Sequence, residues 1–145
     1  MAGYGLEETY HLDRLLQQDL AALNISNQVV NASVSGDTSN GGLNRLAWSL
    51  QDNYDLFILG LGANDMMRGL SPETTKANLE LIIQLVQEKE IPILLTGMVA
   101  PSAYGKEYQN QFNSLYQDLA EQYKLAFYPF LLEGVALKPE LNQSD

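Results

Sequence analysis

Two short apolar segments, separated by one amphipathic helical pattern, constrain the fold of this chain more than any other feature. Residues 55–61 and 91–97 are largely apolar over the length of a strand, which is typical of parallel strands covered on both faces. Between them, four apolar residues recur at helical spacing: Leu79, Ile82, Ile83 and Val86. A crossover helix is the usual connection between two parallel strands. The sequence therefore predicts an α/β domain built on a parallel sheet.

The remaining patterns extend this alternation over residues 1–145, which we interpret as a single domain. A helix is predicted at about residues 7–23, where leucines share one face, and a strand at 28–32. Thr38 or Ser39 can cap a second helix, and Ser71 with Pro72 begins a third. A fourth helix over about residues 108–123 precedes a last strand at 125–128. Because a crossover helix follows a strand, the sheet is expected to lack its first strand.

Composition excludes several classes of function. The net charge is −10, and the eight lysines and arginines are scattered singly, so no nucleic-acid partner is expected. The chain has no cysteine and one histidine, which excludes a thiolate nucleophile and argues against a transition-metal site. No apolar run approaches the roughly 18 residues of a membrane span, so stable membrane insertion is not expected. A periplasmic, secreted or cytoplasmic location is left open.

Polar loops follow two of the predicted strands. Residues 33–38 read Ser-Val-Ser-Gly-Asp-Thr, and residues 60–65 read Gly-Leu-Gly-Ala-Asn-Asp. Open parallel sheets bind ligands at the carboxyl ends of their strands, where both loops are expected to lie. Gly36 could also be a turn glycine, and Asn64 with Asp65 could form a turn or a helix cap. These simpler roles stay open beside that of a ligand site.

Several segments, taken in order, resemble the conserved blocks of the SGNH or GDSL-type ester hydrolases, in the bacterial thioesterase, arylesterase and lysophospholipase branch. Gly36 and its loop resemble the second block, and residues 62–65 resemble the third block, G-x-N-D. Residues 2–5 are similar to those that follow the G-D-S-L nucleophile block. Residues 101–105 resemble a substrate-side loop, and Ser144 with Asp145 resembles the start of the D-x-x-H block. The resemblance implies a three-layer α/β/α, flavodoxin-like parallel sheet (SGNH hydrolase fold) missing its first strand.

The chemistry that this resemblance implies is hydrolysis of a small acyl ester or thioester through a tetrahedral intermediate. Gly36 would donate its backbone N–H and Asn64 its side-chain amide to the oxyanion. Asp145 would orient the catalytic histidine, while Pro101 and Tyr104 would contact the substrate. No cofactor or metal is implied. In a sheet of order 2-1-3-4-5, the two oxyanion loops would flank the missing strand and converge on one point.

The chain departs from the family pattern in two places that decide activity. The nucleophile block would end just before Ala2 and the catalytic histidine would follow Asp145, so the domain looks truncated at both ends. His11 lies on the first predicted helix and is expected to be a surface or boundary residue. We therefore predict that the 145-residue chain alone is inactive and only weakly stable. Two other functions stay open: a non-catalytic remnant that binds acyl ligands or partners, and a flavodoxin-like nucleotide-binding or regulatory domain.

Overall fold

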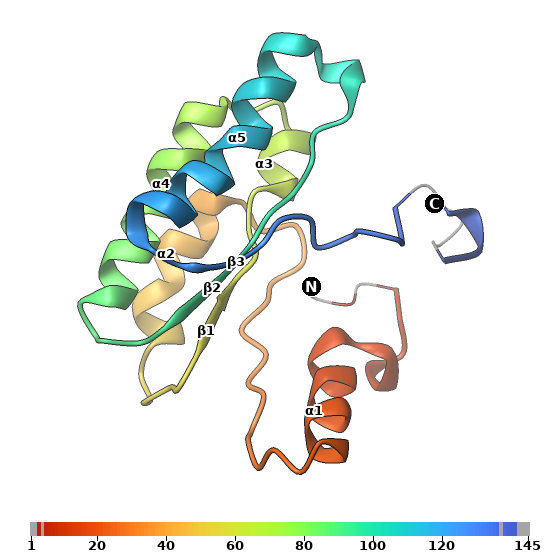
Figure 1. Cartoon of the computed structure of the whole chain (residues 1–145), viewed down its shortest axis with the longest axis vertical. Coiled ribbons are helices and arrows are strands. Elements are labelled where there is room, and N and C mark those ends of the chain that lie inside the picture. Colours follow the sequence, from red (N-terminus) through yellow and green to blue (C-terminus); the bar gives the residue numbers. More distant parts are fainter. Residues whose placement is uncertain (1–2, 4, 137, 142–145) are drawn as a thin grey trace. The chain divides into compact units, whose positions relative to one another are not determined.

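The computed structural model describes the whole chain except residues 1–2, 4, 137 and 142–145. The chain divides into two compact units, residues 1–37 and residues 38–145. Figure 1 shows the helices and strands of each unit.

Residues 1–37 contain a 3₁₀ turn, η1 (Glu8–Tyr10), and one helix, α1 (Leu12–Ala22). The helix predicted at 7–23 is therefore confirmed, with a later start because the backbone of His11 is extended. The strand predicted at 28–32 is wrong, since this segment pairs with no strand. The backbone N–H of Val29 instead donates to the side chain of Gln17 on α1, at 2.7 Å. An apolar β-branched segment becomes a strand only where a second strand offers it hydrogen bonds.

Residues 38–145 form a parallel sheet of three strands, and the sheet is ordered β1-β2-β3. The three strands predicted in this unit are confirmed, each shorter than predicted, and the three predicted helices are also confirmed. A short helix, α3, was not predicted. The elements are α2 (Ser39–Ser49), β1 (Phe57–Leu59), α3 (Ala63–Met67), α4 (Pro72–Gln87), β2 (Ile93–Thr96), η2 (Ser102–Tyr104), α5 (Lys106–Tyr123), β3 (Ala126–Tyr128) and η3 (Pro139–Leu141).

The helix starts follow the capping signals in the sequence. The Thr38 side chain accepts a hydrogen bond from the backbone N–H of Gly41, which caps α2. The Ser71 hydroxyl accepts in the same way from Thr74, and Pro72 occupies the first turn of α4. A helix begins with N–H groups that have no partner inside the helix, so a side-chain oxygen at this point fixes where it starts.

The core of this unit lies between the sheet and one layer of helices. Figure 1 shows α2, α4 and α5 on the same face of the strands, and the α4 residues predicted to face the core are all buried. On the sheet, Leu59 and Leu95 face this layer and are almost fully buried. Across the opposite face, Ile58, Leu94 and Ala126 stand in register and are exposed or half-buried. Residues 38–145 thus supply two of the three expected layers.

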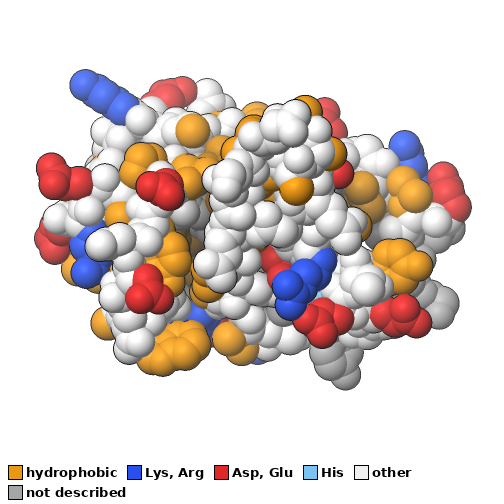
Figure 2. Space-filling model, turned by 90° about the horizontal axis from the view of Figure 1, so that it is seen from below, with side chains coloured by type: hydrophobic (Ala, Val, Ile, Leu, Met, Phe, Trp, Pro, Cys, Tyr) orange, Lys and Arg blue, Asp and Glu red, His pale blue; other side chains and the backbone are white. Residues whose placement is uncertain are grey.

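Charged side chains of the described residues form no continuous patch on the face drawn in Figure 2. In Figure 2, acidic side chains lie scattered between apolar and uncharged ones on the face in view. Among the described residues, no helix combines the length and the apolar character needed to cross a lipid bilayer.

Candidate functional site

The loop after β1 carries the most prominent candidate residue, Asn64. It is a tight corner: Gly62 adopts a φ of +112° and serves as the N-cap of α3, so Asn64 stands in the first turn of a helix. The sequence predicted a plain loop at this point. Asn64 is half-buried, and Gly62 and Asp65 are buried on either side of it. A positive φ is strained for residues that carry a Cβ, so glycine permits this corner.

A buried tyrosine supports this corner from the α5 side. The hydroxyl of Tyr116 donates a hydrogen bond of 2.9 Å to the carbonyl oxygen of Leu61. The same hydroxyl lies so close to Gly62 that a Cβ there would overlap it. One side chain therefore both hydrogen-bonds to this corner and fills the space that a Cβ at Gly62 would need.

A buried acid holds the other side of the corner. Asp65 has no exposed surface, and its carboxylate accepts hydrogen bonds from the backbone N–H of Ser39 at 2.8 Å and from the Ser39 hydroxyl. The Thr75 hydroxyl is a more distant donor at 3.4 Å, and the side-chain amide of Asn78 donates to Ser39 at 2.9 Å. This network joins α3 to the first residue of α2 and to the first half of α4.

The loop after β2 carries the two residues predicted to contact substrate. Pro101 is exposed and precedes η2, which ends at Tyr104 with 39% of its surface exposed. The ring of Tyr104 stacks on Tyr108 at a centroid distance of 5.4 Å. The Tyr108 hydroxyl donates to the carbonyl oxygen of Leu70, between α3 and α4, at 2.9 Å. Tyr108 thus ties the loop after β2 to the segment that follows Asn64.

These contacts belong to a continuous row of four aromatic rings. Tyr108 stacks on Phe112 at 5.8 Å, and Phe112 meets Tyr116 edge to face at 5.7 Å. The row runs from the exposed Tyr104 to the buried Tyr116, which supports the Asn64 corner. The spacing of four residues places the rings of Tyr108, Phe112 and Tyr116 along one face of α5. That spacing is the signal in the sequence for a connection between the two loops, although by itself it indicates only a buried helix face.

The two remaining predicted site residues are Gly36 and Asp145. Gly36 belongs to residues 1–37, where the backbone N–H of Asp37 donates to the carbonyl oxygen of Val34 and closes a turn. Gly36 takes a φ of +76° in this turn and is exposed, so its turn role is confirmed. Its role as an oxyanion donor, and its convergence with Asn64, stay predictions. Asp145 lies outside the described residues.

The comparison with known proteins decides which family this arrangement represents. The family model described as "GDSL-like Lipase/Acylhydrolase family" matches residues 1–145. This chain belongs to the GDSL-like lipase and acylhydrolase family.

Known members of the family resemble the chain over most of its length. It is 39% identical over 145 residues to Esterase TesA of Pseudomonas aeruginosa, covering 99% of this chain and 72% of that protein. It is 40% identical over 118 residues to thioesterase 1/protease 1/lysophospholipase L1 of Escherichia coli K12, covering 81% of this chain and 57% of the relative. The crystal structure of AlinE4, titled an SGNH-hydrolase family esterase, matches with a TM-score of 0.96 and 43% identity, covering 99% of this chain and 78% of AlinE4. The expected α/β class and SGNH hydrolase fold are confirmed.

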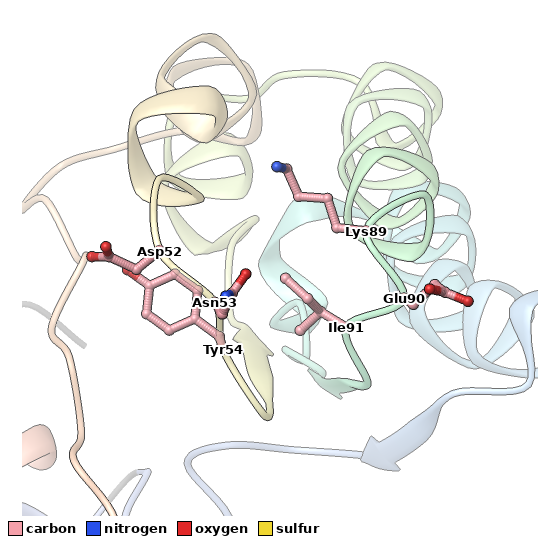
Figure 3. Close-up of a pocket in the computed structure, with 6 residues that line it drawn as sticks. All are labelled: Asp52, Asn53, Tyr54, Lys89, Glu90 and Ile91. Atoms are coloured by element: carbon pink, nitrogen blue, oxygen red, sulfur yellow. The ribbon is translucent and has the colours of Figure 1, made fainter.

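A hollow lies at the amino ends of the strands of this GDSL-like chain. It has a volume of about 360 Å³ and is lined by the segments that lead into β1 and β2: Asp52, Asn53, Tyr54, Lys89, Glu90 and Ile91. Figure 3 shows the carboxylate of Glu90 pointing away from the hollow. Ligand sites in open parallel sheets lie at the carboxyl ends of the strands. Asn64 and the 101–104 loop follow those ends, so we take them as the candidate site in preference to this hollow.

Among the described residues, no group of three histidine, aspartate or glutamate side chains lies close enough to hold a metal ion. His11 lies in residues 1–37, where it is half-buried and its ring nitrogen lies 3.2 Å from the carbonyl oxygen of Leu6.

Replacing Gly62 with alanine is expected to destabilise the chain by about 2–4 kcal/mol. The left-handed backbone contributes about 1–2 kcal/mol, and displacement of the Tyr116 hydroxyl adds a clash of similar size. Gly69 is a matched control, because it also has a positive φ of +66° but has open space around its Cβ direction. Urea unfolding of both variants checks this. Equal losses for Gly62→Ala and Gly69→Ala would contradict a packing role for Tyr116.

The stability of the chain should also fall at high pH because of Tyr116. Burial, and then the nearby charge of Asp65, raise the pKa of the Tyr116 hydroxyl above its ordinary value. Above about pH 10 the unfolded chain loses a proton that the folded chain keeps, so folding loses up to about 1.4 kcal/mol per pH unit.

Tyr116→Phe removes this titration but leaves the other tyrosines in place. The difference in unfolding free energy between the wild-type chain and this variant should be constant below about pH 9 and should shrink as pH rises above about 10. Urea unfolding at several pH values measures it, and a difference that does not change up to about pH 11 would contradict the prediction.

Proposed function

We propose that the chain forms the body of a serine-type hydrolase of carboxylic esters or thioesters, of the arylesterase, acyl thioesterase or lysophospholipase kind. The observation that carries this proposal is the family match over residues 1–145, together with an asparagine held at the carboxyl end of β1. The names of the relatives support the same reaction class, because they are an esterase and a thioesterase that is also named a lysophospholipase.

The proposed chemistry centres on a tetrahedral intermediate that carries a negative oxygen. Asn64 would donate a side-chain N–H to this oxygen, and Gly36 would donate a backbone N–H. Such donors act best when they are already oriented before the reaction, because no energy is then spent turning them in the transition state. The two supports of the Asn64 corner, Tyr116 and Asp65, favour an orientation of this kind.

We infer that the acyl group of the substrate contacts the loop after β2, through Pro101 and Tyr104. Tyr104 is partly exposed and stacks on Tyr108, so it offers an apolar ring edge that is held in place. Tyr108 in turn bonds to Leu70, which follows the Asn64 helix. An apolar contact surface beside an oxyanion donor suits an ester or thioester with a hydrocarbon acyl chain.

We further propose that the nucleophile and the general base are not among these 145 residues. No serine of the chain stands in a Gly-Asp-Ser setting, and the single histidine, His11, belongs to residues 1–37, where it is the N-cap of α1. Asp145 is proposed as the residue that orients the catalytic histidine.

The test is to complete the chain. The 145 residues are joined in frame to the parts of the Pseudomonas aeruginosa esterase that lie outside the matched region, to give a protein that we name the completed chain. It is expected to hydrolyse p-nitrophenyl acetate and an acyl thioester, and to be labelled by a fluorophosphonate, which reacts with activated serines. A completed chain that folds, as judged by circular dichroism, but neither hydrolyses these substrates nor takes the label would overturn the proposal.

A further inference from the structure

Asp65 is a fully buried acid that contacts no substrate and transfers no proton in the proposed chemistry. Its exposed fraction is zero, as are those of its two hydroxyl donors, Ser39 and Thr75. Its carboxylate accepts hydrogen bonds from neutral groups of these two residues. Removing a carboxylate from water is costly unless the protein offers compensating interactions. The start of α2 offers them in this case, because a helix N-terminus carries unpaired N–H groups and a partial positive charge.

The carboxylate is not needed to cap α2. Thr38 already caps this helix, since its side chain accepts from the backbone N–H of Gly41. Asp65 accepts instead from both polar groups of Ser39, the first residue of α2. A two-point contact fixes orientation as well as distance, so the carboxylate joins α3 to α2 in one defined geometry.

Asn64 lies directly between the two fixed points of its corner. On one side, Tyr116 holds the carbonyl of Leu61, and on the other, Asp65 is held by Ser39. Leu61 and Asp65 are four residues apart, so the short backbone between them, which includes Asn64, has little freedom of position. In the sequence, Ser39 follows Gly36 by three residues, so Asp65 also fixes the helix to which the Gly36 turn is covalently joined.

We propose that Asp65 is a positioning residue, which sets the Asn64 amide relative to the start of α2 and so prepares the oxyanion donor before substrate binds. The proposal rests on the ester hydrolase function proposed above. It gives Asp65 no contact with substrate and no proton transfer. Its effect should therefore be on kcat more than on KM, because the oxyanion exists only in the transition state and the intermediate.

Two variants separate positioning from a general loss of structure. Asp65→Asn has nearly the same shape, but one of its two oxygens becomes an amide nitrogen that cannot accept from Ser39. Ser39→Ala removes only the hydroxyl donor and leaves the backbone N–H in place. The matched control is Asp118→Asn, which changes a half-exposed aspartate paired with Lys76 at 2.9 Å.

The first measurement is steady-state kinetics of the completed chain. Asp65→Asn is expected to lower kcat for p-nitrophenyl acetate by about 10- to 100-fold, because a donor displaced by about 1 Å loses this much, while KM changes by less than about threefold. Ser39→Ala should lower kcat by a smaller factor, and Asp118→Asn should have the kcat of the wild type. A kcat for Asp65→Asn equal to that of the wild type would overturn the proposal. If Asp65→Asn does not fold, an unchanged kcat for Ser39→Ala would overturn it.

The second measurement is independent of catalysis. In the isotope-labelled 145-residue chain, the side-chain amide signals of Asn64 should shift or broaden in Asp65→Asn and in Ser39→Ala, but not in Asp118→Asn. If the wild-type completed chain is inactive and these signals respond, the proposed function fails while the positioning contact is supported. If the signals do not respond, the positioning proposal fails whatever the activity.

Discussion

The 145-residue chain by itself is expected to hydrolyse p-nitrophenyl acetate about a million-fold more slowly than the completed chain, because loss of either the nucleophile or its base costs this much in a serine hydrolase. What would remain is an oxyanion donor with no activated oxygen to attack the ester. Positioning and electrostatic groups alone give only the residual part of such catalysis. The fluorophosphonate probe should correspondingly label the completed chain and leave the 145-residue chain unlabelled.

The comparison needs controls for trace contamination and for misfolding. The completed chain with its nucleophilic serine changed to alanine should fall to the level of the 145-residue chain. Near-ultraviolet circular dichroism of the tyrosine row reports whether both proteins have the same packed helix layer. A rate for the isolated chain within about 100-fold of the completed chain would show that residues within these 145 perform the catalysis.

Replacement of Asn64 with alanine in the completed chain is expected to lower kcat by about 100- to 1,000-fold, which is the usual cost of one oxyanion donor. KM should change little, because the amide would contact the negative oxygen of the intermediate more strongly than the ester carbonyl. Asn64→Asp should lose at least as much, since a carboxylate offers an acceptor where a donor is needed. Steady-state kinetics with p-nitrophenyl acetate measures kcat and KM for the completed chain and for both variants.

The matched control for this experiment is Asn53→Ala. Asn53 is exposed and lines the hollow at the amino ends of the strands, away from the carboxyl ends that Asn64 and the 101–104 loop follow. It should keep the wild-type kcat. Equal activity of Asn64→Ala and Asn53→Ala would refute the oxyanion role of Asn64, and would leave the corner after β1 as a structural turn.

Local patterns in the sequence were sufficient to predict those helices and strands whose ends are fixed by nearby residues. The start of α4 is an example, because Ser71 and Pro72 act within one turn of the helix that they begin. The prediction of a strand at residues 28–32 failed for the opposite reason. Its apolar, β-branched residues suit a strand, but pairing depends on a partner that is distant in sequence.

The sequence indicated which residue types belong to the candidate site, but not the helix and the contacts that hold them in place. Asn64 was identified from its motif, but the helix α3 around it was not, since five residues have little helical preference of their own. Contacts from residues far along the chain, Ser39 and Tyr116, hold that helix in place. The sequence indicates only a turn or cap role for Asp65, because nothing in it shows that a carboxylate so close to a polar loop is fully buried.

The outer edge of β1 affects how this chain should be handled in solution. Among the described residues β1 hydrogen-bonds only to β2, so its outer side has a row of backbone groups without strand partners, next to the exposed Ile58. Such an edge is a template on which a second molecule can add, and repeated addition leads to fibrils or amorphous precipitate. Self-association should therefore grow steeply with protein concentration, and dilute samples are the ones in which the monomer persists.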